Sequence, residues 1–182
     1  MTDERLCEVT VEVPAPADLP ELAAVAAATF PLACPPSATP DNIAAFIAEN
    51  LSAQRFAGYL SDPERIVLVS RDGDAITGYA MLIHGVPADD DVQGAVTERP
   101  ALELSKIYVL ADHHRGGAAA ALMAETLKRA ADAGMSCVWL GVNQQNVRAQ
   151  RFYAKHGFNI KGTKTFQLGA GVENDYVMVR TL

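Results

Sequence analysis

The sequence predicts an α/β protein with a central mixed sheet flanked by helices, and three observations lead to this class. Apolar runs at 65–70 and 75–83 flank Asp72-Gly73, a standard signature of a tight hairpin between antiparallel strands. Residues 101–142 then follow a strand, helix, strand pattern, which makes the two strands parallel with a right-handed crossover. With 182 residues, 49% of them hydrophobic, the chain has enough material for one core but not for two ordinary domains. We therefore expect a single domain over residues 1–182.

The first hundred residues predict a strand, three helices and the hairpin. Valines alternate with polar residues over 7–13, which is the period of a half-buried strand. Asp18-Leu-Pro20-Glu21 combines a cap, an early proline and an acidic third position, so a helix should run from here to near Phe30. A proline-rich loop at 31–40 leads into a second helix opened by Thr39-Pro40, and a third short helix is expected at 52–60. We expect 85–100 to be loop.

The second part of the chain predicts alternating strands and helices. The expected elements are a strand at 101–109, a helix at 117–133 that ends at Gly134, a strand at 137–142, a helix at 146–155, and strands at 159–168 and 175–182. No internal repeat and no long linker interrupts this order.

Charge is divided unevenly along the chain. The net charge is −7, but residues 1–100 hold 16 acidic and 5 basic side chains, whereas residues 101–182 hold 6 acidic and 10 basic ones. A basic half suits a polyanionic ligand, and an acidic half suits a cationic one. Nucleic acid is disfavoured because no dense basic stripe with interleaved aromatics occurs. No apolar run is long enough for a membrane span, and the N-terminus lacks the pattern of a signal peptide, so we expect a soluble, cytoplasmic protein with no membrane partner.

The cysteines indicate neither a disulfide framework nor a metal site. Cys7, Cys34 and Cys137 are odd in number, widely spaced and without the spacing of metal ligands. We therefore expect reduced, mostly buried thiols and no metal cofactor. A catalytic cysteine is the alternative, but none of the three lies in a sequence context that would activate a thiol.

The segment His114-Arg115-Gly116-Gly117-Ala118-Ala119 joins the strand at 101–109 to the following helix. The first backbone N–H groups of a helix have no partners and carry partial positive charge, and small residues allow a phosphate to approach them closely. Arg115 lies within this turn, and Arg148, Arg151 and Lys155 follow on a later helix. The turn therefore predicts an anion site, although a merely flexible glycine turn is the simpler alternative.

The helix at 146–155 presents a second candidate binding surface. Asn146 and Tyr153 are seven residues apart, hence on nearly one face, and Ala149 between them leaves room for a ligand. Phe152 should point elsewhere, into the core. Asn146 has an alternative or additional role as the helix cap, and Tyr153 has the alternative of a core aromatic.

Together these segments resemble the GNAT superfamily of N-acetyltransferases, which transfer an acetyl group from acetyl-coenzyme A to an amine. In the family's turn signature, Gln or Arg is followed after two residues by Gly and, one residue further, by Gly or Ala. His114, Gly117 and Ala119 occupy these positions, with His114 as a substitution. The later segment is similar to the family's cofactor-side helix at Asn146, Ala149, Phe152, Tyr153, Gly157 and Phe158. The ending at 166–169 and 175–178 resembles small bacterial polyamine-type acetyltransferases.

The resemblance implies a fold and an assignment of the two halves. The GNAT-like sheet is mixed and mostly antiparallel, with one parallel strand-helix-strand unit at the cofactor site. Residues 101–182 would bind acetyl-coenzyme A and residues 1–100 would form the acceptor side. A bulge would splay the strand at 103–109 from its neighbour and leave backbone groups unpaired for the pantetheine amides. The implied cofactor-binding residues are Ile107, Tyr108, Val109, His114, Arg115, Gly116, Gly117, Ala118, Ala119, Asn146, Ala149, Tyr153 and Lys155.

The resemblance also assigns catalytic roles. Tyr153 would protonate the departing thiolate, because a phenol of pKa about 10 is protonated at neutral pH. A base is needed because an alkyl ammonium of pKa about 10.4 exposes its lone pair in about one molecule in two thousand at pH 7. Glu103 is the expected base, acting through water unless burial raises its pKa, and a solvated or salt-bridged carboxylate is its alternative role. His84 is the competing base.

These observations predict direct acetyl transfer from acetyl-coenzyme A to a primary amine, without a metal or a covalent enzyme intermediate. The acidic residues Asp89–Asp91 and Glu98 suggest a polyamine or another small cation as acceptor. A peptide or protein amine is the alternative acceptor, and an acetyl-coenzyme A sensor without turnover is the alternative function. The resemblance is also compatible with a homodimer.

Overall fold

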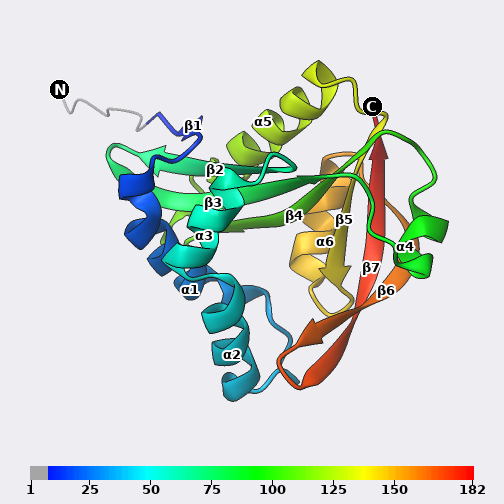
Figure 1. The fold of residues 1–182 in the computed structure, drawn as a ribbon, viewed down its shortest axis with the longest axis horizontal. Helices are drawn as coiled ribbons and strands as arrows, with labels where there is room; N and C mark the ends of the chain where they lie inside the picture. The colour runs from blue at the N-terminus through cyan, green and yellow to red at the C-terminus, as the bar shows by residue number, and fades with distance from the viewer. Residues whose placement is uncertain (1–7) are drawn as a thin grey trace.

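A single seven-stranded sheet, in the order β1-β2-β3-β4-β5-β7-β6, runs through the computed structural model, which describes residues 8–182 (Figure 1). Its strands are β1 (Thr10–Glu12), β2 (Arg65–Asp72), β3 (Ala75–His84), β4 (Ala101–Val109), β5 (Cys137–Asn143), β6 (Asn159–Leu168) and β7 (Gly171–Thr181). Neighbouring strands are antiparallel except β4 and β5, which are parallel. The mixed, mostly antiparallel sheet with one parallel unit is therefore confirmed, as is the hairpin, whose two turn residues are Gly73 and Asp74.

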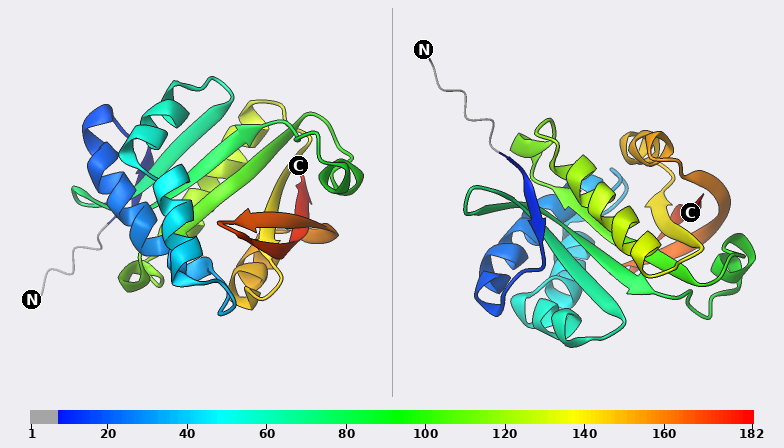
Figure 2. Two further views of the ribbon diagram at one scale, coloured as in Figure 1. Left: turned by 60° about the horizontal axis from the view of Figure 1, so that its bottom comes forward. Right: turned by 90° about the horizontal axis from the view of Figure 1, so that it is seen from above.

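Helices cover both faces of the sheet. The helices α1 (Leu19–Ala33), α2 (Pro40–Asn50) and α3 (Ala53–Ser61) lie on one face, and α5 (Ala118–Asp132) lies on the other, as the two views of Figure 2 show. Apolar side chains from each layer make separate cores, with Leu22, Phe56 and Tyr79 fully buried under α1–α3 and Leu122 and Met123 fully buried under α5. Within residues 8–182, no helix combines the length and apolar character that a membrane crossing requires.

The remaining elements are short. They are α4 (Asp90–Ala95), α6 (Val147–Lys155) and the 3₁₀ turns η1 (Pro16–Asp18) and η2 (Ala111–His113). Helix α4 corrects the expectation that 85–100 is all loop. The Asp89 side chain caps it by accepting hydrogen bonds from the backbone of Asp91 and Val92, at 2.9 and 3.1 Å. It docks on β6 where Gly162 has no side chain, since a Cβ there would lie 2.8 Å from the Cβ of Ala95.

Three expected boundaries differ from the structure. Helix α1 continues past Pro31 to Ala33, because the ring of Phe30 stacks on Phe46 at 4.4 Å and holds the last turn in place. Strand β7 begins four residues earlier than expected, directly after the turn at Gly169, where φ is +59°. Strand β1 is limited to three residues, and Cys7 at its expected start lies outside the described residues.

Strands β4 and β5 separate after a short paired segment, and this opening positions the site. Only Ala101–Glu103 of β4 pairs with β5, at Cys137–Trp139, so the rest of β4 has no strand on that side. A bulge interrupts the pairing of β4 with β3, because Leu82 pairs with Leu104 and Met81 with Lys106, which leaves Ser105 without a partner. The predicted bulge and the splayed strand are therefore confirmed.

Candidate active site

One cavity lies between the open half of β4, the start of α5 and the side of α6. Its volume is about 460 Å³. Ile107, Tyr108 and Val109 line it from β4, as the sequence predicts. The other lining residues are Thr29, Leu32, Ala33, His114, Arg115, Gly117, Ala119, Ala120, Asn146, Arg148, Ala149, Phe152 and Tyr153. We call it the donor cavity.

The start of α5 faces the donor cavity without a side chain to cap it. Gly117 is the N-cap residue, and its φ of +82° is left-handed, a conformation that favours glycine. Ala119 and Ala120 line the cavity, so the first N–H groups of the helix lie beside small side chains. Ala118 instead packs into the core at 2% exposure, and exposed Gly116 lines no part of this cavity. At this end of the donor cavity the wall is therefore formed by the backbone of the turn more than by each predicted side chain.

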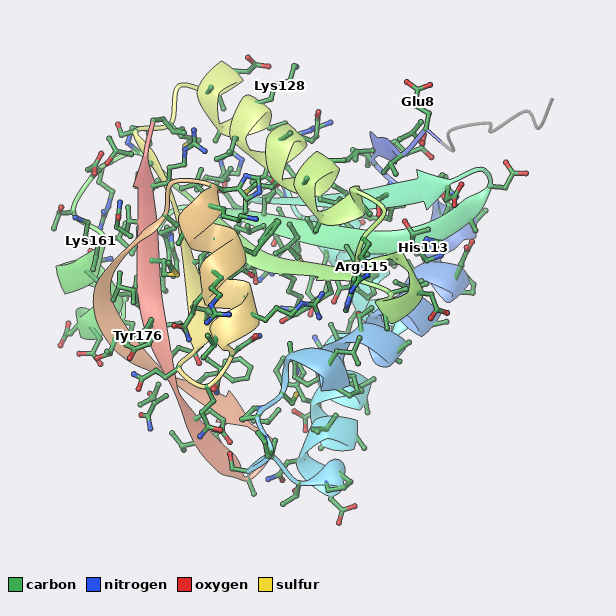
Figure 3. All side chains as sticks on the ribbon, turned by 180° about the vertical axis from the view of Figure 1, so that it is seen from behind. Glu8, His113, Arg115, Lys128, Lys161 and Tyr176 are labelled. Carbon is green, nitrogen blue, oxygen red and sulfur yellow. The ribbon has the colours of Figure 1, made fainter. Side chains whose placement is uncertain are left out.

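Two arginines border the same helix start. Arg115 is exposed and lies beside the beginning of α5 (Figure 3), and Arg148 reaches the cavity from the first turn of α6. Both also line a further depression with Ala111, Asp112 and His114, which shares His114, Arg115 and Arg148 with the donor cavity. Two arginines against one aspartate make this depression positively charged, which favours phosphate groups.

His114 has a structural role in the turn. Its Nε2–H donates a hydrogen bond of 2.8 Å to the backbone carbonyl of Val109, which ties the turn back to the end of β4. A histidine can thus occupy the family's Gln or Arg position while still shaping the turn, and the same side chain lines the cavity.

The residues of α6 meet the donor cavity largely as predicted. Asn146 caps the helix, as predicted, by accepting a hydrogen bond of 3.1 Å from the backbone of Ala149, and it also lines the cavity. Ala149 and Tyr153 line the cavity as well. Phe152 packs against the core, as expected, and its half-buried ring also forms part of the cavity wall.

Lys155 is a correction. It is exposed at the end of α6 and lines neither the donor cavity nor the second cavity described below. The reason is helical geometry, because nine residues at about 100° each place it roughly half a turn away from Asn146. Exposed Arg151 lines neither cavity either.

A second cavity, of about 150 Å³, lies on the other side of Tyr153. It shares Ala33, Tyr108, Asn146 and Tyr153 with the donor cavity, so the two cavities meet at the two tyrosines. We call it the acceptor cavity. Its other lining residues are Phe30, Cys34, Pro35, Phe46, Glu103, Ser105, Lys106, Gly141, Val142, Asn143, Lys164, Phe166, Leu168, Glu173 and Asp175.

One wall of the acceptor cavity is aromatic. Phe30 stacks on Phe46, and Phe46 contacts Phe166 with ring centroids 5.4 Å apart. Tyr108 meets the edge of Phe30 at 6.4 Å. These rings bring α1, α2, β4 and β6 together, so the wall exists only after elements far apart in the sequence have packed.

The bulge in β4 decides which side chains face the acceptor cavity. Side chains alternate along a strand, so Glu103 and Lys106 would point to opposite faces of a regular strand. The extra residue at Ser105 shifts the register by one, and Glu103, Lys106 and Tyr108 all line the acceptor cavity. The bulge thus places the carboxyl of Glu103, the amine of Lys106 and the phenol of Tyr108 on the same side of β4.

A further ionic pair comes from the last two strands. Lys164 of β6 pairs in register with Asp175 of β7, and Nζ of Lys164 lies 3.7 Å from Oδ2 of Asp175. Asp175 is 7% exposed, and burial raises the pKa of this carboxyl although Lys164 opposes the shift. Glu173 lies two residues earlier on the same strand.

Burial alters the acidity of the groups at the junction. Desolvation raises the pKa of Glu103, against the attraction of Lys106 and Lys164, which favours a carboxyl that can accept and release a proton nearer neutral pH. Desolvation alone raises the pKa of Tyr153, so its phenol stays protonated. Burial lowers the pKa of Lys106 to about 8.

Of the other catalytic candidates, His84 and the acidic residues lie outside both cavities, whereas Cys34 lines one of them. His84 ends β3 and lines neither the donor nor the acceptor cavity. Asp89 caps α4, and Glu98 accepts a hydrogen bond from the Thr181 hydroxyl, so this acidic group has structural roles. Cys34 lines the acceptor cavity, but desolvation raises the pKa of its thiol to about 11, which disfavours a nucleophilic thiolate.

Several lining residues were not identified from sequence. Phe30, Phe46, Lys164 and Asp175 are ordinary helix and strand residues until the tertiary structure assembles them. Lys106 carried a signal, because lysine is depleted in strands and this one lies within a predicted strand that is mostly apolar. Within residues 8–182 no group of histidine, cysteine and acidic side chains could hold a metal ion.

The fold thus holds two cavities that meet at Tyr108 and Tyr153, beside the open half of β4. The profile of the acetyltransferase (GNAT) family matches residues 28–158. The chain is 58% identical, over 91% of its length and 98% of the relative's, to an uncharacterised N-acetyltransferase of Mycobacterium tuberculosis. The chain therefore belongs to the GNAT family and is an N-acetyltransferase.

Solved structures agree on the fold. The PaiA N-acetyltransferase from Thermoplasma acidophilum, solved in complex with coenzyme A, aligns with a TM-score of 0.75 and 17% identity over 96% of this chain and 99% of the other. The ribosomal-protein-S18-alanine N-acetyltransferase from Escherichia coli aligns with a TM-score of 0.66 and 19% identity over 96% and 94%. At these identities the likeness concerns the fold.

Proposed function

We propose that this chain, as one domain over residues 1–182, transfers the acetyl group of acetyl-coenzyme A directly to a primary amine. The observation that carries the proposal is the meeting of the donor and acceptor cavities at Tyr108 and Tyr153. A donor on one side and an amine on the other would approach each other at a buried phenol without leaving the protein. Holding two reactants in this way contributes much of the rate acceleration in a bimolecular transfer.

The donor cavity fits acetyl-coenzyme A. When bound, this molecule supplies an acetyl group activated as a thioester. The uncapped start of α5 at Gly117, with Arg115 and Arg148 beside it, suits the pyrophosphate. The open edge of β4 over Ile107–Val109 presents backbone groups to the pantetheine amides. Lys155 has no part in this binding.

The residues at the junction supply proton transfer. Glu103 receives a proton as the acceptor ammonium becomes a neutral amine, directly or through water. As the nitrogen forms its bond to the acetyl carbon and the carbon–sulfur bond breaks, Tyr153 gives its phenolic proton to the sulfur. The proton that the nitrogen loses in forming the amide restores the phenol. The balance is one amide, one thiol and one released proton per ammonium consumed.

The arrangement of Glu103 and Tyr153 favours an enzyme over a sensor. A binding module has no need of a carboxyl and a phenol that line one cavity, yet Glu103 and Tyr153 both line the acceptor cavity here. Their raised pKa values also suit an acid and a base more than a solvated surface. The acceptor is a small-molecule amine in this proposal, with a peptide amine as the alternative.

The test is release of coenzyme A thiol from acetyl-coenzyme A by the purified protein with a panel of polyamines, simple amines, amino acids and short peptides. Release that depends on one class of amine supports the proposal and identifies the acceptor. Coenzyme A binding without release for any class would overturn it and favour a sensor. Mass spectrometry of the product distinguishes amine acetylation from simple thioester hydrolysis.

A further inference from the structure

The acceptor cavity carries both signs of charge. Three carboxyl groups, Glu103, Glu173 and Asp175, and two lysines, Lys106 and Lys164, line it together with the aromatic wall. A polycation entering this space would bring its additional ammonium groups against two lysines. Like charges in a partly buried site repel strongly, so this composition does not suit a polyamine.

The two lysines differ in their contacts with other side chains. Lys164 is paired with Asp175 at 3.7 Å and also lies over the ring of Phe166 at 5.6 Å. Lys106 has no carboxylate within 4.0 Å among residues 8–182, and within these residues it donates one long hydrogen bond, of 3.5 Å, to the hydroxyl of Ser105. An ammonium has three donors, so most of the hydrogen-bonding capacity of Lys106 is directed into the cavity unused.

The bulge in β4 places the Lys106 side chain on the side of the acceptor cavity. Without the bulge at Ser105, Lys106 would face α5 and Glu103 would not share its side of β4. An ammonium held away from water without a counter-ion is costly, and the lowered pKa of Lys106 reflects that cost. A bound anion would offset it.

Glu103 and Lys106 therefore present opposite charges to one cavity without forming an ion pair with each other. A ligand with an ammonium and a carboxylate complements this arrangement, with the ammonium toward Glu103 and the carboxylate toward Lys106. The aromatic wall of Phe30, Phe46 and Phe166 accommodates an apolar side chain.

We infer that the acceptor is a primary amine that also carries a carboxylate and an apolar side chain, and that Lys106 binds the carboxylate. This inference rests on the proposed acetyl transfer and narrows its acceptor. Lys106 is here a specificity-determining residue, while Glu103 and Tyr153 serve the reacting amine and the leaving sulfur.

The experiment compares matched acceptors. Leucine and phenylalanine are assayed against leucinamide and phenylalaninamide, which keep the amine and side chain but lack the carboxylate, and against spermidine. The variants are Lys106→Gln, which removes the charge, and Lys161→Gln, an exposed lysine on β6 (Figure 3) that lines neither cavity. For the acids, Lys106→Gln is expected to raise KM about ten- to a hundredfold, as loss of a charged hydrogen bond implies. The amides should be poor substrates that Lys106→Gln does not weaken further.

Faster turnover of spermidine or the amides than of the acids would overturn the inference, as would an equal loss for acids and amides in Lys106→Gln. Lys161→Gln should leave every value unchanged. A binding experiment distinguishes failure of this inference from failure of the proposed function. If no amine releases thiol, calorimetric binding of N-acetylphenylalanine in the presence of coenzyme A, lost in Lys106→Gln, retains the inferred carboxylate site while the transfer proposal fails. Absence of that binding in the unchanged protein rejects the carboxylate site itself.

Discussion

Gly141 of β5 provides the space in which the Lys164 side chain of β6 lies, although β7 separates the two strands. A Cβ at position 141 would lie 2.5 Å from Cε of Lys164 and 3.3 Å from Oδ2 of Asp175. The absence of one methyl group thus allows Lys164 to reach across β7 and pair with Asp175 inside the acceptor cavity.

Replacing Gly141 with alanine tests this relationship. Because the clash involves the flexible end of a lysine, the side chain should move away, and the free energy of unfolding should change by less than about 1 kcal/mol. The KM for the acceptor should rise several-fold while coenzyme A affinity stays constant. Gly58→Ala is the matched control, since Gly58 lies in α3 with nothing within 4 Å, and it should increase stability by about 0.5–1 kcal/mol without any kinetic effect. Unchanged acceptor kinetics in Gly141→Ala would mean that Lys164 does not shape the site.

Tyr153→Phe removes the proposed acid and keeps the ring. Turnover should fall about a hundredfold or more, because a general acid contributes this much, while coenzyme A binding measured by calorimetry stays within about twofold of the unchanged protein. Tyr176→Phe, on β7 and outside both cavities, is the control and should retain full activity. Equal activity of the two variants would show that Tyr153 is only a packing residue.

Glu103→Gln tests the base through the pH dependence of kcat/KM. The folded protein raises the pKa of Glu103, so the ionised, proton-accepting form is lost as pH falls through a value above the ordinary glutamate pKa of about 4.3. Activity should therefore decline on the acidic side at a pH above that reference value. The variant should lose this decline along with most of its turnover. A low-pH decline that survives in Glu103→Gln would assign it to another group.

The start of α5 offers a matched pair of glycines. Gly117 has φ of +82°, so Gly117→Ala should cost about 1–2 kcal/mol of stability and weaken coenzyme A binding by distorting the helix start. Gly116 has no positive φ, and a Cβ there would meet the His113 carbonyl at an ordinary 3.5 Å, so Gly116→Ala should be nearly neutral. Thermal unfolding and calorimetry measure both. Similar effects of the two substitutions would remove the special role of Gly117.

The charge on Lys106 should make acceptor binding weaker as pH rises, whereas ionisation of Glu103 should make turnover faster as pH rises. Its pKa of about 8 means that it is charged below this pH and neutral above it, with Glu103 favouring the charged form and Arg65 and Lys164 opposing it. The KM for a carboxylate-bearing amine should therefore rise as pH increases through about 8, whereas KM for the matching amide should not. Lys106→Arg, which stays charged, should abolish the rise. An identical pH profile for acid and amide would contradict this prediction.

The local sequence was sufficient for the elements and for most of the donor cavity. Asp72-Gly73 defined its hairpin, and residues 114–119 and 146–153 carried their own geometry, because a helix start and the face of one helix depend on neighbours within a few residues. Lys155 was misplaced within that same helix, whereas Phe152 packs against the core, as expected, and also lines the donor cavity. The sequence interpretation assigned Lys155 to the same helix face as Asn146, and helical periodicity could have corrected this assignment.

The acceptor cavity was decided by the tertiary structure. Phe30, Phe46, Lys164 and Asp175 come from four separate elements, and no local pattern specifies that their side chains converge. The bulge at Ser105 decided the orientation of Lys106, since one extra residue reverses which face a strand residue occupies. The sequence by itself determined that this protein has a helix start of small residues at Gly117 and a later helix that carries Tyr153. Only long-range packing and strand register determined which charges the acceptor amine meets.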